Sequence, residues 1–141
     1  MTEKKKFDPN NPCLFCKPKH KEIIAETELA VLVTDTYPVS LGHCLVLPKR
    51  HIADYFDCSE EENRDFRTLI LKAKETIDKE HAPDAYNIGN NNGLYAGQSV
   101  FHLHIHIIPR YKGDVDNPKG GVRWVVPKKS QYKYPIESNK S

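Results

Sequence analysis

Apolar residues along this chain come in short runs, and their spacing changes from every second residue to every third or fourth. Short or alternating apolar runs bounded by turn residues are typical of β-strands. They predict a hairpin of Ile23 to Glu26 and Leu29 to Thr34, a strand over residues 44–47 that ends at Pro48, and another over residues 85–89. With a fifth strand before Pro109, these segments form a five-stranded, mainly antiparallel sheet.

One longer segment has helical spacing. Ser59 and Glu62 form a capping-box signature, which marks the start of a helix. The apolar positions that then recur at helical spacing are Phe66, Leu69, Ile70, Ala73 and Ile77. The pattern predicts one amphipathic helix over residues 60–79. Several strands with one long helix on one face indicate an α+β domain.

The segment from Ser99 to Pro109 carries His102, His104 and His106 between apolar neighbours. In a strand, successive side chains point to opposite faces, so the three imidazoles would share one face. The residues expected on the core face are Phe101, Leu103, Ile105 and Ile107. A single strand histidine is usually structural, but three would crowd groups whose neutral and charged forms are close in energy near pH 7. The pattern therefore favours a chemical site.

Two kinds of chemistry fit a row of histidines. Alternate strand residues stand about 6.5–7 Å apart, so one metal ion reaches two of them more easily than three. Alternatively, one imidazole attacks a phosphorus atom while its neighbours set its tautomer or bind the developing charge. The preceding loop, residues 90–97, contains Gly93 and Gly97, whose backbone N–H groups can approach phosphate oxygens. The ordinary interpretation of this loop is a turn between two strands.

Length, charge and apolar content exclude some classes of protein. With 141 residues and a net charge of +2, one domain is expected and no particular partner is indicated, nucleic acid included. No apolar run approaches the roughly 20 residues of a membrane helix. The charged start, residues 1–6, leads into a Pro- and Asn-containing segment and not into the apolar region of a signal peptide. We expect a cytoplasmic protein without a membrane partner.

The chain has four cysteines, too few and too unevenly placed for a disulfide scaffold. Cys13 and Cys16 are two residues apart, which is typical of a metal site or a redox pair. A redox motif belongs at a helix start beside a βαβ unit, whereas residues 12–18 are expected to be a loop. Cys44 is expected in the core of its strand, and Cys58 has no partner spacing.

The segment from Gly97 to Arg110 resembles the signature of the histidine triad (HIT) superfamily of nucleotide hydrolases and transferases. The resemblance extends to residues 35–51, which include Gly42-His43-Cys44-Leu45-Val46-Leu47-Pro48-Lys49-Arg50-His51, and to the helix that follows. It implies a HIT-like fold in which the helix and sheet form one half of a homodimer.

The resemblance implies a role for each matching residue. His104, the middle histidine, would be the nucleophile that attacks the α-phosphorus and carries a nucleotidyl group, with His106 as the second catalytic histidine. The positions that contact substrate in the family, mainly its phosphates, correspond to His43, Asn91, Gln98 and Ser99. Asp35, eight residues before His43, matches the acid that binds ribose hydroxyls. The alternative role for Asp35 is that of a turn residue.

The resemblance also provides partners for the two cysteines. In many bacterial HIT proteins and in galactose-phosphate uridylyltransferases, a cysteine pair and two histidines bind a structural zinc ion. The matching ligand set here is Cys13, Cys16, His51 and His102, which would complete a tetrahedral Zn²⁺ site. Reduced buried thiols and a redox pair are the alternatives.

Residues 110–141 form a basic extension that resembles HIT members acting on dinucleoside polyphosphates more than the shorter Hint-type phosphoramidases. The cations of residues 119–141 would favour a polyphosphate, although such charge runs are often only solubilising. These cations are Lys119, Arg123, Lys128, Lys129, Lys133 and Lys140. Tyr111 and Trp124 would stack on a base or hold the extension to the domain.

These expectations combine into one HIT domain over residues 1–141, with a zinc-binding loop (1–22), a core (23–109) and the extension (110–141). The expected activity is hydrolysis of a diadenosine polyphosphate or similar dinucleoside polyphosphate through covalent His104. Structural zinc is the expected cofactor, and a divalent cation accompanying the polyphosphate is a further candidate. The alternatives are an adenylate phosphoramidase, a phosphorylase that uses inorganic phosphate, and a nucleotide-binding sensor without turnover.

Overall fold

The computed structural model describes residues 13–133 of the chain, which divide into two compact units with the boundary between Tyr111 and Lys112. The charged start of the chain and Lys140 of the basic extension lie outside the described residues. No helix within residues 13–133 is long and apolar enough to span a membrane.

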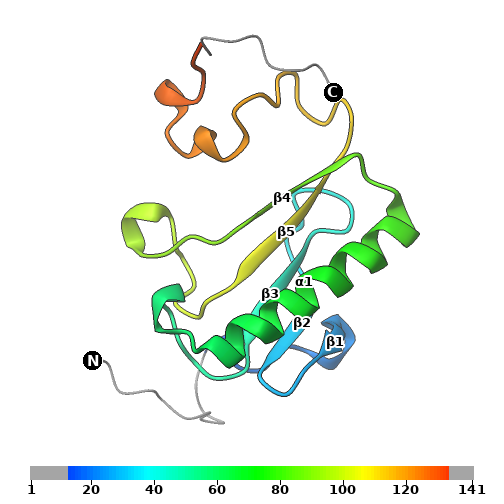
Figure 1. Ribbon diagram of the computed structural model, residues 1–141, viewed down its shortest axis with the longest axis vertical. Coiled ribbons are helices and arrows are strands. Elements are labelled where there is room, and N and C mark those ends of the chain that lie inside the picture. The colour runs from blue at the N-terminus through cyan, green and yellow to red at the C-terminus, as the bar shows by residue number, and fades with distance from the viewer. Residues whose placement is uncertain (1–12, 134–141) are drawn as a thin grey trace. The chain divides into compact units, whose positions relative to one another are not determined.

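The first unit is built on a five-stranded sheet with one long helix, α1 (Glu60–His81), across one face (Figure 1). All neighbouring strands are antiparallel. The strands in spatial order are β1 (Ile23–Glu26), β2 (Ala30–Thr34), β3 (Cys44–Pro48), β5 (Ile105–Arg110) and β4 (Ala85–Gly89). Short 3₁₀ turns are η1 (His20–Glu22), η2 (Tyr55–Asp57) and η3 (Leu94–Ala96). The predicted α+β architecture is confirmed.

Helix α1 begins where the capping box predicted. The Ser59 hydroxyl accepts from the Glu62 N–H, and the Glu62 carboxylate accepts from the Ser59 N–H, which satisfies two N–H groups that a helix start leaves free. The helix runs two residues beyond the predicted end and stops at Ala82 in the left-handed conformation (φ 47°). Its buried apolar residues pack on the sheet and form the main core with β2, β3 and β5; they are Phe66, Leu69, Ala73 and Ile77.

The face of the sheet opposite α1 has a smaller apolar cluster, made of Val31, Val33, Leu45 and Leu47. Strand alternation then places the residues at the ends of these strands on the same side. Asp35 follows Val33 by two residues, and His43 precedes Leu45 by two. The register pairs Leu45 with His106 on β5. The side chains of Asp35, His43 and His106 therefore lie beside this second cluster, on the face of the sheet away from the helix.

The histidine segment is less regular than expected. β5 begins at Ile105, so His102 and His104 precede the strand. The pairing of β3 with β5 ends at Val46 and Ile105, and the Leu103 N–H instead bonds to the Ile52 carbonyl at 2.6 Å. Leu103, Ile105 and Ile107 are buried as predicted. The prediction that Phe101 lies in the core was wrong, because it precedes this ladder and its side chain is 49% exposed.

The second unit, from Lys112 onward, contains two 3₁₀ turns, η4 (Gly121–Val125) and η5 (Pro127–Lys129). Arg123 holds them together: its guanidinium donates to the Ser130 and Lys129 carbonyls at 3.2 and 2.6 Å and lies 4.2 Å from the Tyr132 ring centre. Gly120 has φ +100°, and a Cβ there would lie 2.6 Å from the Ser130 carbonyl oxygen. The Arg123 charge, expected to attract substrate, is used within this unit.

Candidate catalytic and metal sites

The side chain of His104 has its tautomer set by the backbone. Its Nδ1 lies 2.9 Å from the carbonyl oxygen of His102, and a carbonyl only accepts hydrogen bonds. The proton of neutral His104 is therefore on Nδ1, and the lone pair is on Nε2. The imidazole is largely buried, with 8% of the residue exposed. His104 thus presents an unprotonated nitrogen in a fixed orientation, as a histidine nucleophile requires.

A second backbone contact sets the protons of His43 and His106. The Val39 N–H donates to His43 Nδ1 at 3.1 Å, so neutral His43 carries its proton on Nε2. That Nε2 lies 2.9 Å from His106 Nδ1, which must accept. Neutral His106 then carries its proton on Nε2. The rings of His104 and His106 are neighbours, with centres 5.1 Å apart, so a donor stands beside the candidate nucleophile.

Asp35, His43 and His106 also converge closely enough to hold a cation. The Asp35 carboxylate lies 3.3 Å from His43 Nε2 and 3.9 Å from His106 Nδ1. A metal ion there would need the lone pair of His43 on Nε2, but the Val39 N–H holds that lone pair on Nδ1. The cluster is therefore better suited to positioning protons than to binding a metal.

Asp35 has a structural use of its own. Its Oδ1 accepts from the Tyr37 N–H at 2.8 Å, which closes the turn after β2, while Oδ2 faces His43. The turn interpretation is thus borne out by this contact. The turn leaves the Asp35 side chain 15% exposed at the edge of the site, where a ribose hydroxyl could reach it.

Burial controls the charge of the paired histidines. Burial, followed by the nearby imidazoles of His104 and His43, lowers the pKa of His106 to about 4. Burial also lowers the pKa of His43, against the opposing effect of the Asp35 carboxylate. Both imidazoles are therefore neutral at pH 7. The proton arrangement derived from the hydrogen bonds applies at neutral pH.

The loop between β4 and β5 is held by side-chain amides. Gln98 is 3% exposed; its Oε1 accepts from the Gly93 N–H, and its Nε2 donates to the carbonyls of Ala53 and Val100. Asn92 Oδ1 accepts from the Tyr55 N–H at 2.7 Å, and Asn92 Nδ2 donates to the Asp54 carboxylate at 3.1 Å. Gln98, expected at a phosphate, thus has its amide engaged in the loop itself, whereas Ser99 is exposed and Asn91 is partly exposed.

The second site consists of Cys13, Cys16, His51 and His102, whose ligand atoms all lie within 4.8 Å of one another. Cys16 Sγ is 3.1 Å from His51 Nδ1 and 3.5 Å from His102 Nδ1. Cys13 Sγ lies 3.6 Å from His102 Nδ1, and the Nδ1 atoms of His51 and His102 are 3.3 Å apart. A tetrahedral zinc ion with cysteine and histidine ligands implies edges of about 3.3–3.8 Å. The four residues can hold a metal ion.

The protonation of these ligands supports the same interpretation. His102 Nε2 lies 2.8 Å from the Pro48 carbonyl, so it donates there and leaves the Nδ1 lone pair facing the cysteines. Burial lowers the pKa of His102 to about 4, which keeps it neutral. Burial and Cys13 raise the pKa of the Cys16 thiol to about 12, so without a cation this buried thiol stays protonated. A bound metal ion would displace that proton.

Phe15 was missed in the sequence, although it lies between the two cysteines. Its ring contacts both His102 and His104, with centres 6.2 and 5.0 Å apart. It also packs on the apolar cluster of the second sheet face. The turn that carries Cys13 and Cys16 therefore places an aromatic ring beside the candidate nucleophile. The spacing of the cysteines alone could not indicate this contact.

The chain is similar to three relatives, two of which are named for an activity. It is 42% identical to an uncharacterized HIT-like protein of Methanocaldococcus jannaschii, over 77% of this chain and 87% of that protein. It is 40% identical to an adenosine 5′-monophosphoramidase of Schizosaccharomyces pombe, over 70% of this chain and 74% of the relative. It is also 36% identical to a bis(5′-nucleosyl)-tetraphosphatase of the same yeast, over 69% of this chain but only 53% of that enzyme.

Solved structures show the same fold. A HIT family protein from Bacillus anthracis matches with a TM-score of 0.68 and 36% identity, over 74% of this chain and 77% of the other. A zinc-bound histidine triad family protein from Mycobacterium smegmatis matches with a TM-score of 0.64 and 32% identity, over 73% and 78%. The HIT domain family model matches residues 17–113, which carry both β-sheet faces, the helix and the histidine segment. The chain therefore belongs to the HIT domain family.

Proposed function

We propose that this protein is a nucleotide hydrolase or nucleotidyl transferase that works through a covalent nucleotidyl group on His104. The observation that carries the proposal is the 2.9 Å contact between His104 Nδ1 and the His102 carbonyl. In the neutral ring it leaves the Nε2 lone pair free, in a largely buried side chain. A nucleophile prepared in this way needs no separate base to activate it.

The proposed reaction has two steps. His104 Nε2 forms a bond to the α-phosphorus, and the bond from phosphorus to the leaving oxygen or nitrogen breaks, with its electron pair going to the leaving atom. The Nε2–H of His106 donates a hydrogen bond to that atom, and the bond from His43 Nε2–H to His106 Nδ1 keeps His106 in this tautomer. A phosphate leaving group departs as its anion, and an amine leaving group takes a proton from solvent. Water then attacks the phosphorus, the phosphorus–nitrogen bond breaks with its electron pair returning to His104 Nε2, and the proton lost by the water goes to solvent.

An apolar cavity gives the nucleoside a place to bind. It has a volume of about 300 Å³ and is lined by Phe15, Cys16, Pro18, Ile23, Glu26, Val31 and Lys49. Phe15 connects it to the His104 ring, so a base in this cavity would lie on the same face as the reacting histidine. Aromatic and aliphatic walls of this kind suit a flat base. We assign the ribose to the exposed edge of Asp35 and the phosphates to Ser99, Asn91 and the backbone of the β4–β5 loop.

Two substrate classes fit this chemistry. The expected substrate is a dinucleoside polyphosphate, in which a phosphoanhydride bond breaks. A nucleoside phosphoramidate is the second candidate, since the match with this chain covers 74% of the monophosphoramidase relative but only 53% of the tetraphosphatase. The two differ only in the leaving group, which the His106 donor can serve in either case.

A substrate panel tests the proposal. Purified protein would be supplied with an adenylate amidate or a diadenosine tetraphosphate, with and without inorganic phosphate, and products would be separated by chromatography. Release of AMP with kcat/KM higher for the tetraphosphate supports the expected class, and ADP formed only with phosphate would identify a phosphorylase. Absence of turnover on every compound, with AMP still bound, would leave a nucleotide-binding sensor.

We further propose that the Cys13, Cys16, His51 and His102 site holds a structural zinc ion and that the protein is a homodimer. The zinc proposal is supported by ligand separations close to those of a tetrahedral site and by the zinc-bound relative from M. smegmatis. Zinc there would tie the N-terminal turn to the histidine segment. The chemistry of the reaction remains with His104 and its neighbours.

A further inference from the structure

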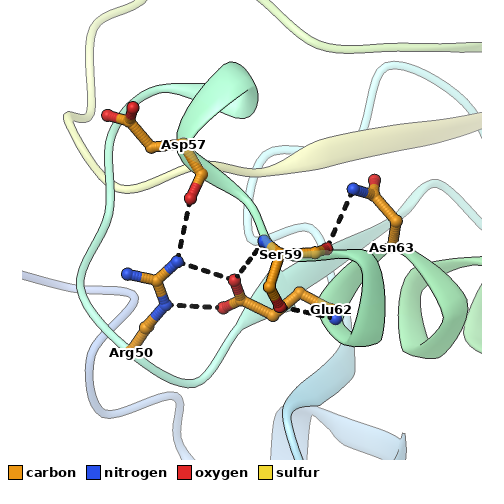
Figure 2. A network of polar contacts seen from close by, with 5 residues as sticks. All are labelled: Arg50, Asp57, Ser59, Glu62 and Asn63. Carbon is orange, nitrogen blue, oxygen red and sulfur yellow. Dashed lines mark hydrogen bonds and ion pairs between the residues drawn. The ribbon is translucent and has the colours of Figure 1, made fainter.

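The segment that joins β3 to α1 has anchors on both sides of its backbone. Arg50 reaches the N-terminus of α1, and Figure 2 shows its guanidinium facing the Glu62 carboxylate. The next residue, His51, faces Cys16 and His102. Alternate residues of an extended segment point to opposite sides, and Ile52 accordingly returns to the core beneath the helix. The metal ligand is thus one residue away from a contact with the helix.

The contact between Arg50 and the helix is a bidentate ion pair with short hydrogen bonds. Arg50 Nε and Nη2 donate to the two oxygens of Glu62 at 2.8 and 2.7 Å, and Nη2 also donates to the Asp57 carbonyl at 3.0 Å. Glu62 is 3% exposed. A two-pronged arginine–carboxylate pair fixes direction as well as distance. Through Glu62 and Ser59, the pair is continuous with the capping box (Figure 2).

The other ligands of the proposed metal site have their own supports. His102 is oriented by the Pro48 carbonyl, and Cys13 and Cys16 share a turn closed by the Cys16 N–H and the Cys13 carbonyl. In contrast, the hydrogen bonds of the His51 ring within residues 13–133 all involve the cluster itself. The direction of His51 therefore depends on its backbone. That backbone is held on one flank by the hydrogen bond between the Leu103 N–H and the Ile52 carbonyl, and on the other flank by the Arg50 side chain.

We propose that Arg50 is a positioning residue for the metal site, which it serves by holding the backbone of His51 in place before the ion binds. The inference rests on the proposed metal site. A ligand that is already ordered loses less conformational entropy on binding, so affinity rises without any new contact to the ion. The Arg50–Glu62 pair would couple the start of α1 to metal affinity although neither residue binds the ion.

Three variants separate this role from general stability. Arg50→Met combined with Glu62→Gln removes the pair without leaving a buried charge, and the glutamine can still accept from the Ser59 N–H. Arg50→Lys keeps the positive charge but cannot form the two-pronged contact with the Glu62 carboxylate. Ser59→Ala is the matched control, because it weakens the same helix start while the Arg50–Glu62 contact remains.

Zinc affinity would be measured by competition with a chromogenic chelator, and melting would be recorded with and without zinc. We expect the double variant to bind zinc at least fivefold more weakly, about 1 kcal/mol, with a smaller zinc-induced rise in Tm. Arg50→Lys should be intermediate, and Ser59→Ala should lower Tm equally in both states with unchanged affinity. If wild type binds zinc and the double variant binds it equally well, the positioning role is wrong. If wild type binds none, both it and the metal proposal are wrong, whereas the His104 reaction is tested separately by turnover.

Discussion

At the scale of single residues, the site depends on where three protons lie. Carbonyl and N–H groups of the backbone decide this for His102, His104 and His43. In each imidazole, one nitrogen is hydrogen-bonded to the backbone, and the other faces the residues or the space of the site. Neighbouring residues of the same type thus differ in chemistry: His102 Nδ1 faces the cysteines, whereas His104 leaves Nε2 for the proposed substrate.

Replacing His104 with alanine should abolish turnover while the fold and nucleotide binding persist. The expected loss is several orders of magnitude, because the nucleophile is absent and its neighbours cannot replace it. Steady-state kinetics and AMP binding by calorimetry would measure both effects. A variant that kept more than about a tenth of the wild-type rate, a change of under 1.4 kcal/mol in the barrier, would contradict the covalent mechanism.

The partly buried imidazole of His106 should make the protein sensitive to acid. Its pKa is about 4 in the folded chain, against an ordinary value of 6.5, because burial disfavours the charged form. Between these values the unfolded chain binds the extra proton, so the free energy of unfolding falls as pH drops from about 6.5 to 4. Urea unfolding of wild type and His106→Gln across this range is the measurement. If the stability difference between the two proteins did not change with pH, the buried neutral state would be excluded.

At the scale of elements, most candidate site residues lie on loops, with His106 on β5, and the helix and sheet hold these loops in place. The Cys13–Cys16 turn, the β3–α1 segment and the β4–β5 loop are joined by named contacts: Cys16 with His51, Gln98 with Ala53 and Asn92 with Asp54. Binding residues on loops are useful only when a rigid scaffold orients them. Here the scaffold is the second face of the sheet, with α1 stabilising it from behind.

Removing the thiols of the Cys13–Cys16 turn should destabilise the protein more than it slows the chemical step. We expect wild type made without chelators to contain about one zinc ion per chain by elemental analysis, as a single four-ligand site requires. The Cys13→Ser, Cys16→Ser double variant should lose the zinc and melt at least about 4 °C lower, the shift that corresponds to about 1 kcal/mol in a small domain. Unchanged melting, or metal-free wild type supplied with zinc, would contradict the site.

At the scale of the whole molecule, the basic extension is a unit with its own contacts. Arg123 and Trp124 are engaged within it, the latter through its indole N–H and the Lys119 carbonyl. Lys128 and Lys129 lie on η5 and are exposed, so they are the better candidates for attracting a polyphosphate.

Replacing Lys128 and Lys129 with alanine should therefore reduce kcat/KM for a diadenosine tetraphosphate more than for an adenylate amidate. The longer substrate has more negative charge beyond the attacked phosphorus, and the preference should shrink as salt shortens the Debye length from about 10 Å at 0.1 M to 3 Å at 1 M. Arg123→Ala is the contrasting variant, expected to loosen the unit itself. Equal losses on both substrates in the lysine variant would show that these cations do not select the polyphosphate.

The mass in solution tests the homodimer. β4 is an edge strand of the sheet, and its Ile88 is 49% exposed, which leaves a strand edge and apolar surface for a partner. Light scattering on purified protein should give about twice the chain mass of 16.2 kDa. A mass of 16.2 kDa at micromolar concentration would contradict the dimer.

The sequence by itself determined the elements whose signals are local. Short or alternating apolar runs located β1, β2, β3 and β4, and the capping box located the start of α1, because these signals act over a few residues. It also indicated the buried Cys44 and the separate character of the histidine segment. The spacing of the two cysteines and the resemblance to the HIT family singled out the four residues that the fold brings together.

Only the tertiary structure decided how those residues divide their work. Strand alternation put the three histidines on one face, but the ladder begins at Ile105, and Leu103 bonds to Ile52 instead. The tautomers, the use of Gln98 and Arg123 as structural ties and the Phe15 wall all depend on contacts between segments far apart in the chain. Such contacts have no local signal, because a hydrogen bond across a fold depends on where the backbone places its partner and not on neighbouring residues.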